Sequence, residues 1–279
     1  MSLLLGLCAA LLWAFHDLCV RYVTQQVSVL PALLTVLVCG ALIVLPVAVV
    51  LGDWQAMTAT SYGLSALSGV AFAGASLSLY GAFANGPVRL VAPIIGAYPV
   101  LSVGWGVMTG TEVTPHQWGA VLIIIAGVAL VAILSNDTRH GGQKIRAVIL
   151  AVCAGTGFAL TFAFAQAAIQ HGSDLPVIVA TRAAALAVVG LILLATRQGY
   201  RPRKTALPLL AGMGFLDATA LALVTVAGTQ PHPEFAAVSS SLFGLLTVVL
   251  AWAILKEPMT RQQWGAAVMV FGGIGYLGF

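Results

Sequence analysis

The sequence predicts an all-α integral membrane protein with ten transmembrane helices, arranged as two inverted five-helix repeats around a central cavity. Three observations predict this fold class. The 279-residue chain is 60% hydrophobic and only 7% charged, with a mean hydropathy of +1.03, whereas a soluble domain is about 45–50% apolar and about 25% charged. Its apolar runs are close to the ~20 residues that cross a bilayer. Finally, the two halves share a sequence pattern.

The shared pattern runs from an apolar stretch through a glutamate to a Gln-Trp-Gly triplet and then a further glycine. The matched residues are Glu112, Gln117-Trp118-Gly119 and Gly127 in the first half, and Glu257, Gln263-Trp264-Gly265 and Gly273 in the second. A unit of this length that occurs twice is a duplicated multi-helix unit, because small solenoid modules recur several times. We therefore expect a first repeat at 1–135, a cytoplasmic linker at 136–146 and a second repeat at 147–279.

Ten apolar runs are separated by Pro, Gly, Asn and Asp residues typical of turns. The runs are continuous rather than alternating, which predicts helices and not the strands of a barrel. Pro93 and Pro99 predict kinks in the fourth run. The expected spans are Leu3–Tyr22, Val29–Leu51, Ser61–Ala84, Val88–Gly110, Gln117–Leu134, Ala147–Gln170, Leu175–Thr196, Ala206–Gly228, Phe235–Leu255 and Gln262–Leu277.

The basic residues predict the orientation in the membrane. Counted from the N-terminus, the odd-numbered connections hold eleven of the twelve Lys and Arg residues, and the even-numbered ones hold none. By the positive-inside rule the odd connections are cytoplasmic and both termini lie outside. Because five spans per repeat is an odd number, the second repeat enters the membrane inverted. Inverted repeats are typical of secondary transporters, whose substrate binds between the repeats near the midplane.

Other classes of protein have no support in the sequence. The four cysteines lie inside apolar runs without a CxxC pair, and no histidines lie at metal-ligand spacing. Walker A, GxSxG and HExxH motifs are absent, so neither an ATP-driven pump nor an intramembrane hydrolase is indicated. We expect no enzyme activity, no cofactor, no metal and no nucleic-acid partner. The first apolar run is too long for a signal-peptide core, and we expect it to be retained.

The chain resembles the EamA-like branch of the drug/metabolite transporter superfamily. The similar stretches are APIIGAYPVLSVGWGVMTGTEVTPHQWGAVLIIIAGVALV, its counterpart AVSSSLFGLLTVVLAWAILKEPMTRQQWGAAVMVFGGIGYL, and Leu12-Trp13 with Arg21 in the first span. This resemblance covers essentially the whole chain. It implies a ten-helix carrier of small metabolites such as amino acids, with a cavity between its halves, and says little about the substrate.

Ionisable residues inside the spans are candidates for binding substrate or protons, because a charge at the bilayer centre costs about 2.5–3.5 kcal/mol. Asp217, near the middle of its span, is a substrate-amine ligand, a proton carrier or a helix-packing partner. Arg182 either pairs with Asp217 or binds a substrate carboxylate in bidentate fashion. His16 is either structural or a proton-coupling group. For Asp17 we favour an ion pair with Arg21, four residues later on the same helix.

A second set of candidates consists of gate and cavity residues. Glu112 and Glu257 end their helices at the membrane surface as solvated helix ends, as part of a gate or as caps for the following helix. Lys256 and Arg261 are candidate partners of Glu257. Polar and aromatic residues are candidates for the cavity lining, with helix packing and lipid contact as the alternatives. They are Trp13, Ser76, Ser78, Tyr80, Tyr98, Phe158, Phe162, Gln166, Ser239, Ser240, Ser241 and Phe243.

Together these features predict a secondary carrier in a bacterial inner membrane that works on a gradient by alternating access. The expected substrate is a small polar or zwitterionic metabolite, foremost an amino acid, and protons are the candidate coupling ion. The alternatives are a carrier of nucleobases, organic cations or drugs, and a non-transporting membrane assembly protein. The expected partners are the substrate and the lipid bilayer.

Overall fold

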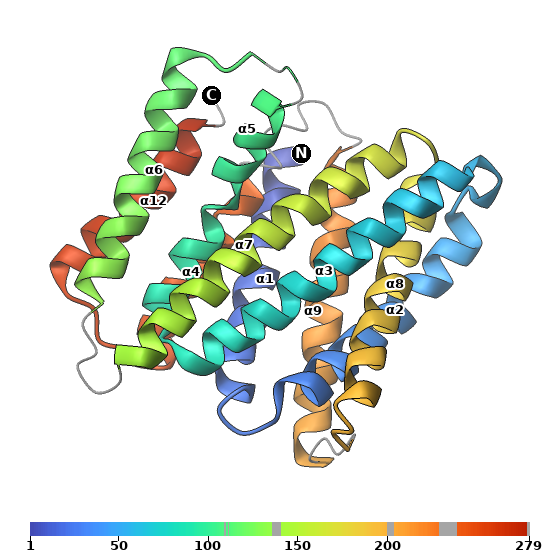
Figure 1. Cartoon of the computed structure of the whole chain (residues 1–279), viewed down its shortest axis with the longest axis horizontal. Coiled ribbons are helices and arrows are strands. Elements are labelled where there is room, and N and C mark those ends of the chain that lie inside the picture. The colour runs from blue at the N-terminus through green and yellow to red at the C-terminus, as the bar shows by residue number, and fades with distance from the viewer. Residues whose placement is uncertain (109, 111, 136–140, 200–203, 229–238, 278–279) are drawn as a thin grey trace.

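The computed structural model describes residues 1–279 apart from 109, 111, 136–140, 200–203, 229–238 and 278–279 (Figure 1). All regular structure in the described ranges is helical. The predicted start of the ninth span, at Phe235, and the first half of the predicted linker lie outside them. The helices are α1 (Ser2–Val23), α2 (Val29–Leu51), α3 (Ala59–Asn85), α4 (Val88–Gly96), α5 (Tyr98–Met108), α6 (Pro115–Leu134), α7 (Gly141–Ile169), α8 (Asp174–Ala195), α9 (Leu207–Gly228), α11 (Phe243–Ile254) and α12 (Arg261–Leu277), with 3-10 turns η1 (Trp54–Ala56) and η2 (Lys204–Ala206).

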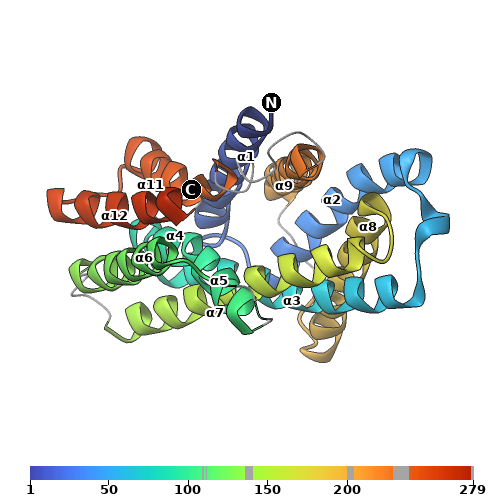
Figure 2. The ribbon, with the colours of Figure 1, turned by 90° about the horizontal axis from the view of Figure 1, so that it is seen from above.

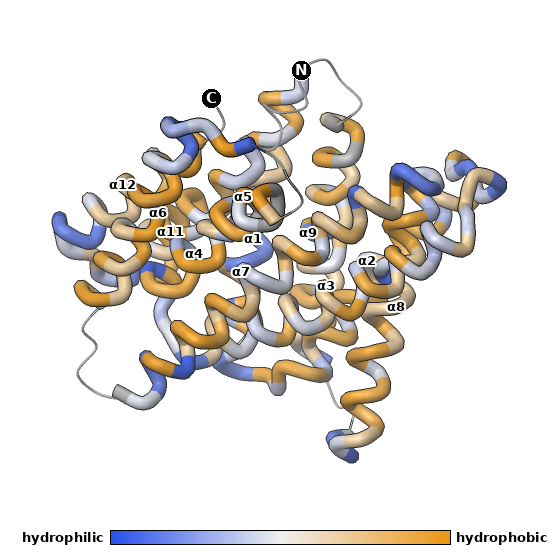
Figure 3. Tube along the Cα trace, turned by 45° about the horizontal axis from the view of Figure 1, so that its top comes forward, coloured by the Kyte–Doolittle hydropathy of each residue, from blue (hydrophilic) through white to orange (hydrophobic). Residues whose placement is uncertain are grey.

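The outer surface of the helices is apolar. Seven of the described helices, α1, α2, α3, α6, α7, α8 and α9, are long and apolar enough to cross a membrane. Large side chains on them remain exposed, such as Leu42 at 64%, Leu122 at 66% and Leu194 at 75%, and the hydrophobic colour runs along the helices in Figure 3. Extended apolar surface of this kind is suited to lipid. The chain is therefore a multi-pass membrane protein.

The fourth predicted span is broken into two helices. α4 ends at Gly96, and α5 resumes after Ala97. Pro99 lies in the first turn of α5, where its missing N–H is tolerated, whereas in the interior of a continuous helix it would remove a hydrogen bond to Ile95. Pro93, by contrast, lies inside α4. The predicted kink thus takes the form of a break near the middle of the span.

The repeated Gln-Trp-Gly triplets begin the last helix of each half in the same way. At α6, the backbone N–H of Thr114 donates to the side-chain oxygen of Gln117 at 2.9 Å within a capping box. At α12, the N–H of Thr260 donates to Gln263 at 2.9 Å, and the N–H of Gln263 donates to the Thr260 hydroxyl at 3.2 Å. A capping box satisfies N–H groups that a helix start leaves unbonded. This requirement explains why the glutamine recurs.

The last helices of the two halves, α6 and α12, pack against each other through the repeated glycines (Figure 1). A Cβ atom on Gly127 would lie 2.8 Å from Val270, and one on Gly273 would lie 2.8 Å from Ile124. Each glycine therefore meets the residue three positions before the other glycine. Reciprocal contacts of this kind are the pattern of an interface with two-fold symmetry.

The remaining helices pack in crossed pairs. α3 packs on α7 and on α8, while α1 packs on α9 and α2 packs on α8 and α9. Across the α3–α7 contact, the Ser61 hydroxyl donates to the Ala168 carbonyl and the Ser68 hydroxyl to the Thr161 carbonyl, both at 2.9 Å. Figure 2 shows α2, α3 and α8 on one side of the molecule and α6, α11 and α12 on the other, with α1 and α9 between them.

The crossing of α3 and α8 leaves no room for a side chain at Gly69. A Cβ atom there would overlap the backbone oxygen of Thr181 and the Cβ of Ala184. We predict that Gly69→Ala lowers the stability by about 1–3 kcal/mol, the usual cost of overpacking, seen as a lower thermal unfolding midpoint of the detergent-purified protein. Gly74→Ala on the same helix is the control, because its Cβ would meet nothing within 4 Å. Equal midpoints for the two variants would contradict the close crossing.

Candidate functional site

A cavity of about 680 Å³ lies inside the helical bundle, within the range of about 300–1,000 Å³ usual for ligand pockets. Side chains from both halves of the chain line it, from α1, α2, α3, α5, α7, α8, α9 and α11. At one end the lining reaches Asp53 and Gly172, in the connections before α3 and α8, and Asp174, the first residue of α8. We call this end the mouth. Among the described residues, none from the connections at the opposite end lines the cavity.

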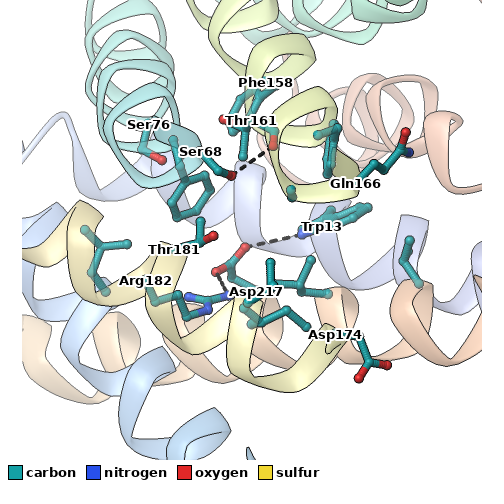
Figure 4. Close-up of a pocket in the computed structure, with 18 of the residues that line it drawn as sticks. Trp13, Ser68, Ser76, Phe158, Thr161, Gln166, Asp174, Thr181, Arg182 and Asp217 are labelled. Atoms are coloured by element: carbon teal, nitrogen blue, oxygen red, sulfur yellow. Dashed lines mark hydrogen bonds and ion pairs between the residues drawn. The ribbon is translucent and has the colours of Figure 1, made fainter. Parts of the chain in front are cut away.

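An ion pair between α8 and α9 lies in the cavity wall (Figure 4). Arg182 donates from Nη2 to Oδ2 of Asp217 at 2.7 Å, and the indole N–H of Trp13 donates to Oδ1 at 3.3 Å. Arg182 is only 2% exposed. Both carboxylate oxygens of Asp217 therefore have a donor. Of the two alternatives for Arg182, the structure contains the pairing with Asp217.

Neighbouring helices leave space for the Arg182 guanidinium but do not satisfy it. A Cβ atom on Gly40 of α2 would lie 2.9 Å from its Nη1, and the ring of Phe72 on α3 lies 5.9 Å from its Cζ, a cation–π distance. Its Nε and Nη1, and the hydroxyl of adjacent Thr181, have no hydrogen-bond partner within the described part of the chain. Such unbonded buried groups cost about 1–3 kcal/mol each. They are therefore unsatisfied polar groups beside the cavity.

A second polar pair lies on α1. Nδ1 of His16 is 3.2 Å from Oδ1 of Asp17, and both residues are buried, at 7% and 4% exposed. The His16 ring also meets the ring of Tyr80 edge-on, with centroids 6.3 Å apart. The prediction that Asp17 pairs with Arg21 is wrong, because among the described residues Arg21 has its ion pair with Glu257 instead.

The contacts of Arg21 and Glu257 close the end of the molecule opposite the mouth. Nε of Arg21 is 3.5 Å from Oε1 of Glu257, and its Nη1 donates to the Phe83 carbonyl at 2.6 Å. Glu257 accepts from the backbone N–H groups of Val88 at 3.2 Å and Arg89 at 3.4 Å. This Arg21–Glu257 cluster joins α1, the end of α3, the start of α4 and the connection after α11.

The two repeat glutamates have different environments. Glu112 is exposed, whereas the Glu257 side chain is 12% exposed. The contacts of Glu257 are with Arg21 and the start of α4, rather than with Lys256 or Arg261, because free N–H groups and the positive end of the helix dipole at a helix start favour a carboxylate. Glu257 is thus a cap of α4, a helix far away in the sequence, and not a solvated helix end.

Most of the candidate lining residues do meet in the cavity. Those that line it are Trp13, His16, Asp17, Ser76, Tyr80, Tyr98, Phe158, Phe162, Gln166, Arg182, Asp217 and Phe243. Aromatic rings are in contact within this set, with centroids of Trp13 and Phe243 6.1 Å apart and those of Tyr98 and Phe162 5.5 Å apart. Ser239 and Ser240, at 5% and 3% exposed, are buried just before α11 and are not among the described lining residues. Arg21, Ser78, Glu112, Ser241 and Glu257 are not among them either.

Sequence analysis missed several lining residues, among them Phe72, Thr181, Asp53 and Asp174. Phe72 was detectable in two ways. It precedes Ser76 by four residues on one helix face, and it is the counterpart of Asp217 at the repeat offset of 145. Asp53 and Asp174 gave no such indication. Asp53 lies in the connection before α3 and Asp174 begins α8, and only the packing of α3, α7 and α8 brings these two places together at the mouth.

Fold and site together define a class: multi-pass membrane proteins, helical throughout the described residues, with a largely apolar cavity that contains an ion pair and is lined from both halves of the chain. The chain belongs to the EamA-like transporter family, whose model matches residues 1–133 and 145–279. The resemblance seen in the sequence is thereby confirmed, and the protein is a membrane transporter of the drug/metabolite type.

A solved structure with a similar fold is described only as the crystal structure of a protein. It superposes with a TM-score of 0.71 over 99% of this chain and 95% of its own, at 13% sequence identity. At this identity the likeness shows the fold alone. No curated protein matches the chain.

We predict that Asp217→Asn destabilises the protein by about 3–5 kcal/mol, the usual cost of removing one partner of a buried ion pair, because it leaves Arg182 without a counter-charge. Adding Arg182→Gln restores most of the loss, since both charges are then gone. Thermal unfolding of the purified single and double variants measures both effects, with Glu112→Gln, which replaces an exposed acid, as the control. A single variant as stable as the parent protein would show that the pair contributes nothing to folding.

Proposed function

We propose that the protein is a gradient-driven carrier that works by alternating access and transports a small metabolite with an ammonium group, foremost an amino acid, across a bacterial inner membrane. One observation carries this proposal. Asp217 presents a carboxylate beside Arg182, whose Nε and Nη1 are without a partner in the described structure, inside a cavity of about 680 Å³. A zwitterion complements this pair, with its ammonium group near Asp217 and its carboxylate accepting charge-assisted hydrogen bonds from Arg182.

An organic cation without a carboxylate is the second candidate, and the charge of the lining favours it. The carboxylates of Asp17, Asp53, Asp174 and Asp217 line the cavity, against one guanidinium, that of Arg182. A cleft lined mostly by one sign of charge concentrates the opposite ion. The aromatic rings of the lining bind ammonium groups through cation–π contacts.

Counterflow in proteoliposomes tests both candidates. Labelled phenylalanine and its decarboxylated analogue phenethylamine are matched probes, because they share the aromatic ring and ammonium group and differ in the carboxylate. We expect exchange of phenylalanine or other amino acids, and near-complete loss of exchange in Asp217→Asn, which keeps the size of the side chain but not its charge.

The other outcomes of this screen discriminate between the alternatives. Exchange of the amine alone supports the cation carrier. Silence across amino acids, amines and nucleobases, with folded protein and a verified gradient, counts against any carrier and favours an assembly protein.

We further propose ten spans in two inverted repeats, residues 1–135 and 147–279, with a cytoplasmic linker at 136–146. In this arrangement α4 with α5 forms one span, and α11 with the residues before it forms another. The packing supports the proposal. If α1–α6 are mapped in order onto α7–α12, the α3–α7 contact corresponds to α1–α9, the α3–α8 contact to α2–α9, and the α6–α12 contact to itself.

The cavity lining supports the same symmetry. Positions 145 residues apart line it in pairs: Trp13 with Phe158, Asp17 with Phe162, Leu37 with Arg182, Phe72 with Asp217, and Tyr98 with Phe243. Equivalent faces of equivalent helices therefore enclose the cavity.

Orientation and closure follow from the two ends. The mouth carries Asp53 and Asp174, while the Arg21–Glu257 cluster lies among the lysine- and arginine-rich connections. By the positive-inside rule the mouth faces outward, as do both termini, and the cluster lies on the cytoplasmic side. The described conformation is thus open to the outside, and the cluster holds its cytoplasmic end closed.

Cysteine labelling checks orientation and closure together. In a variant without the four native cysteines, Ser76→Cys in the cavity wall should react with an impermeant maleimide from outside and be protected from the cytoplasmic side. Adding Glu257→Gln removes the charge that holds Arg21 and the start of α4, so we expect labelling from the cytoplasmic side as well. Glu112→Gln, the matched change in the other repeat, should not permit labelling from the cytoplasmic side. Labelling of the parent from the cytoplasm alone would overturn the orientation.

A further inference from the structure

The two carboxylates deep in the cavity are not equally neutralised. Asp217 binds Arg182 at 2.7 Å and Trp13 at 3.3 Å. Asp17 has, among the described residues, a single hydrogen-bond partner, the His16 ring at 3.2 Å. The charge of a histidine depends on whether it holds a proton. Asp17 therefore has no fixed counter-charge, although it is only 4% exposed.

The helices packed against α1 do not supply the missing charge. The helices that pack most extensively on α1 within the described residues are α3, α9 and α11. The described part of α11 contains no ionisable residue. The ionisable groups near Asp17 are Asp217 from α9, with Arg182 of α8 bound to it, Tyr80 from α3, and Cys19 and Arg21 from α1 itself. The two arginines are already bound to Asp217 and Glu257.

Burial of an uncompensated carboxylate is strongly unfavourable. The pair of His16 and Asp17 becomes neutral when it holds one proton. That proton is either on the ring, giving an imidazolium beside a carboxylate, or on the acid beside a neutral ring. Because the two groups are in hydrogen-bond contact, the proton lies between them in either arrangement.

The hydroxyl of Tyr80 is an unsatisfied polar group beside the His16–Asp17 pair in the described structure. Its side chain is 1% exposed, and its hydroxyl has no hydrogen-bond partner in the described part of the structure. The ring contacts His16, and the phenol interacts electrostatically with Asp17. Buried hydroxyl groups are normally bonded. The unbonded hydroxyl beside the pair therefore marks a polar group that the described residues themselves do not satisfy.

The pair is also placed between the two ends of the cavity. His16 and Asp17 both line it, so they communicate with its mouth. Arg21, one helical turn beyond Asp17, belongs to the cluster that closes the other end. A group in this position exchanges with one side of the membrane while the cluster is formed, and with the other side once the cluster opens.

We infer that the His16–Asp17 pair, and not Asp217, is the binding site of a coupling proton. The pair takes up a proton from water at the open end and releases it at the opposite end after the carrier changes conformation. The Arg182–Asp217 pair keeps its charges throughout and binds the substrate. This assignment rests on the proposed function as a carrier.

Concentrative uptake driven by a pH difference tests the assignment. With one proton per substrate, a difference of about one pH unit supports about tenfold accumulation of labelled phenylalanine or phenethylamine, because each 1.4 kcal/mol is a factor of ten. We expect the wild-type protein to accumulate the probe, and the ratio to fall to about one in Asp17→Asn and in His16→Gln. His171→Gln, which replaces an exposed histidine in the connection before α8, is the matched control and should keep the wild-type ratio.

Each result supports or overturns a specific claim. Wild-type flux that does not respond to the pH difference, or full accumulation by Asp17→Asn, overturns the proton site and leaves the carrier intact. Absence of any wild-type flux contradicts the proposed function instead.

If Asp17→Asn carries no flux at all, nitrogen NMR of the histidine rings tests whether the His16–Asp17 pair holds the proton. The signal of His16 is assigned as the one that disappears in His16→Gln. A His16 signal that titrates between about pH 5 and 8 and changes in Asp17→Asn supports the pair. A signal that stays constant over that range overturns it.

Discussion

The interior of this transporter depends on the neutralisation of charge inside a membrane, which the Arg182–Asp217 ion pair achieves at 2.7 Å. A lone guanidinium or carboxylate is costly there, so the two residues require each other. Their meeting in turn requires α8 and α9 both to pack on α2, so that the two side chains reach each other beside it. The packing is close, because a Cβ atom at Gly40 of α2 would come within 2.9 Å of Nη1 of Arg182. The charge balance of the cavity therefore depends on how closely these helices pack.

The two halves share the arrangement of their helices but differ in the side chains that line the cavity. At an offset of 145 residues, Asp217 corresponds to Phe72, and Arg182 lies between these two positions, bonded to the first and 5.9 Å from the ring of the second. The guanidinium thus contacts equivalent positions of both halves, one as a carboxylate and the other as an aromatic face. In three such pairs one half carries a charge where the other keeps an apolar residue, namely Asp17 with Phe162, Leu37 with Arg182, and Phe72 with Asp217. The charges of the cavity therefore come from both halves.

Much of this architecture was predictable from sequence, because hydropathy and repetition act over long stretches. The helices follow from hydropathy, and the shared face of Phe158, Phe162 and Gln166 follows from spacing along one helix. Pro99 predicted a kink where the structure has a break, and the pairing of Arg182 with Asp217 was one of two alternatives, suggested by opposite charges inside spans. What was not predictable depends on which ends of distant helices meet. Spacing along α1 favoured Arg21 as the partner of Asp17, but the free N–H groups at the start of α4 attract Glu257, and Glu257 in turn binds Arg21.

The Arg21–Glu257 cluster also breaks the symmetry between the halves in a way that bears on the unoccupied carrier. At the repeat offset, Arg21 corresponds to Gln166, which has no charge to bind Glu112. An equivalent cluster at the mouth would therefore lack its ion pair, and the two conformations of an otherwise symmetrical carrier would differ in free energy. Populations follow such differences steeply, about tenfold for each 1.4 kcal/mol. Without substrate, most molecules would have the cavity open to the same side of the membrane. The conformational change of the empty carrier to the other state would then limit the rate of the transport cycle.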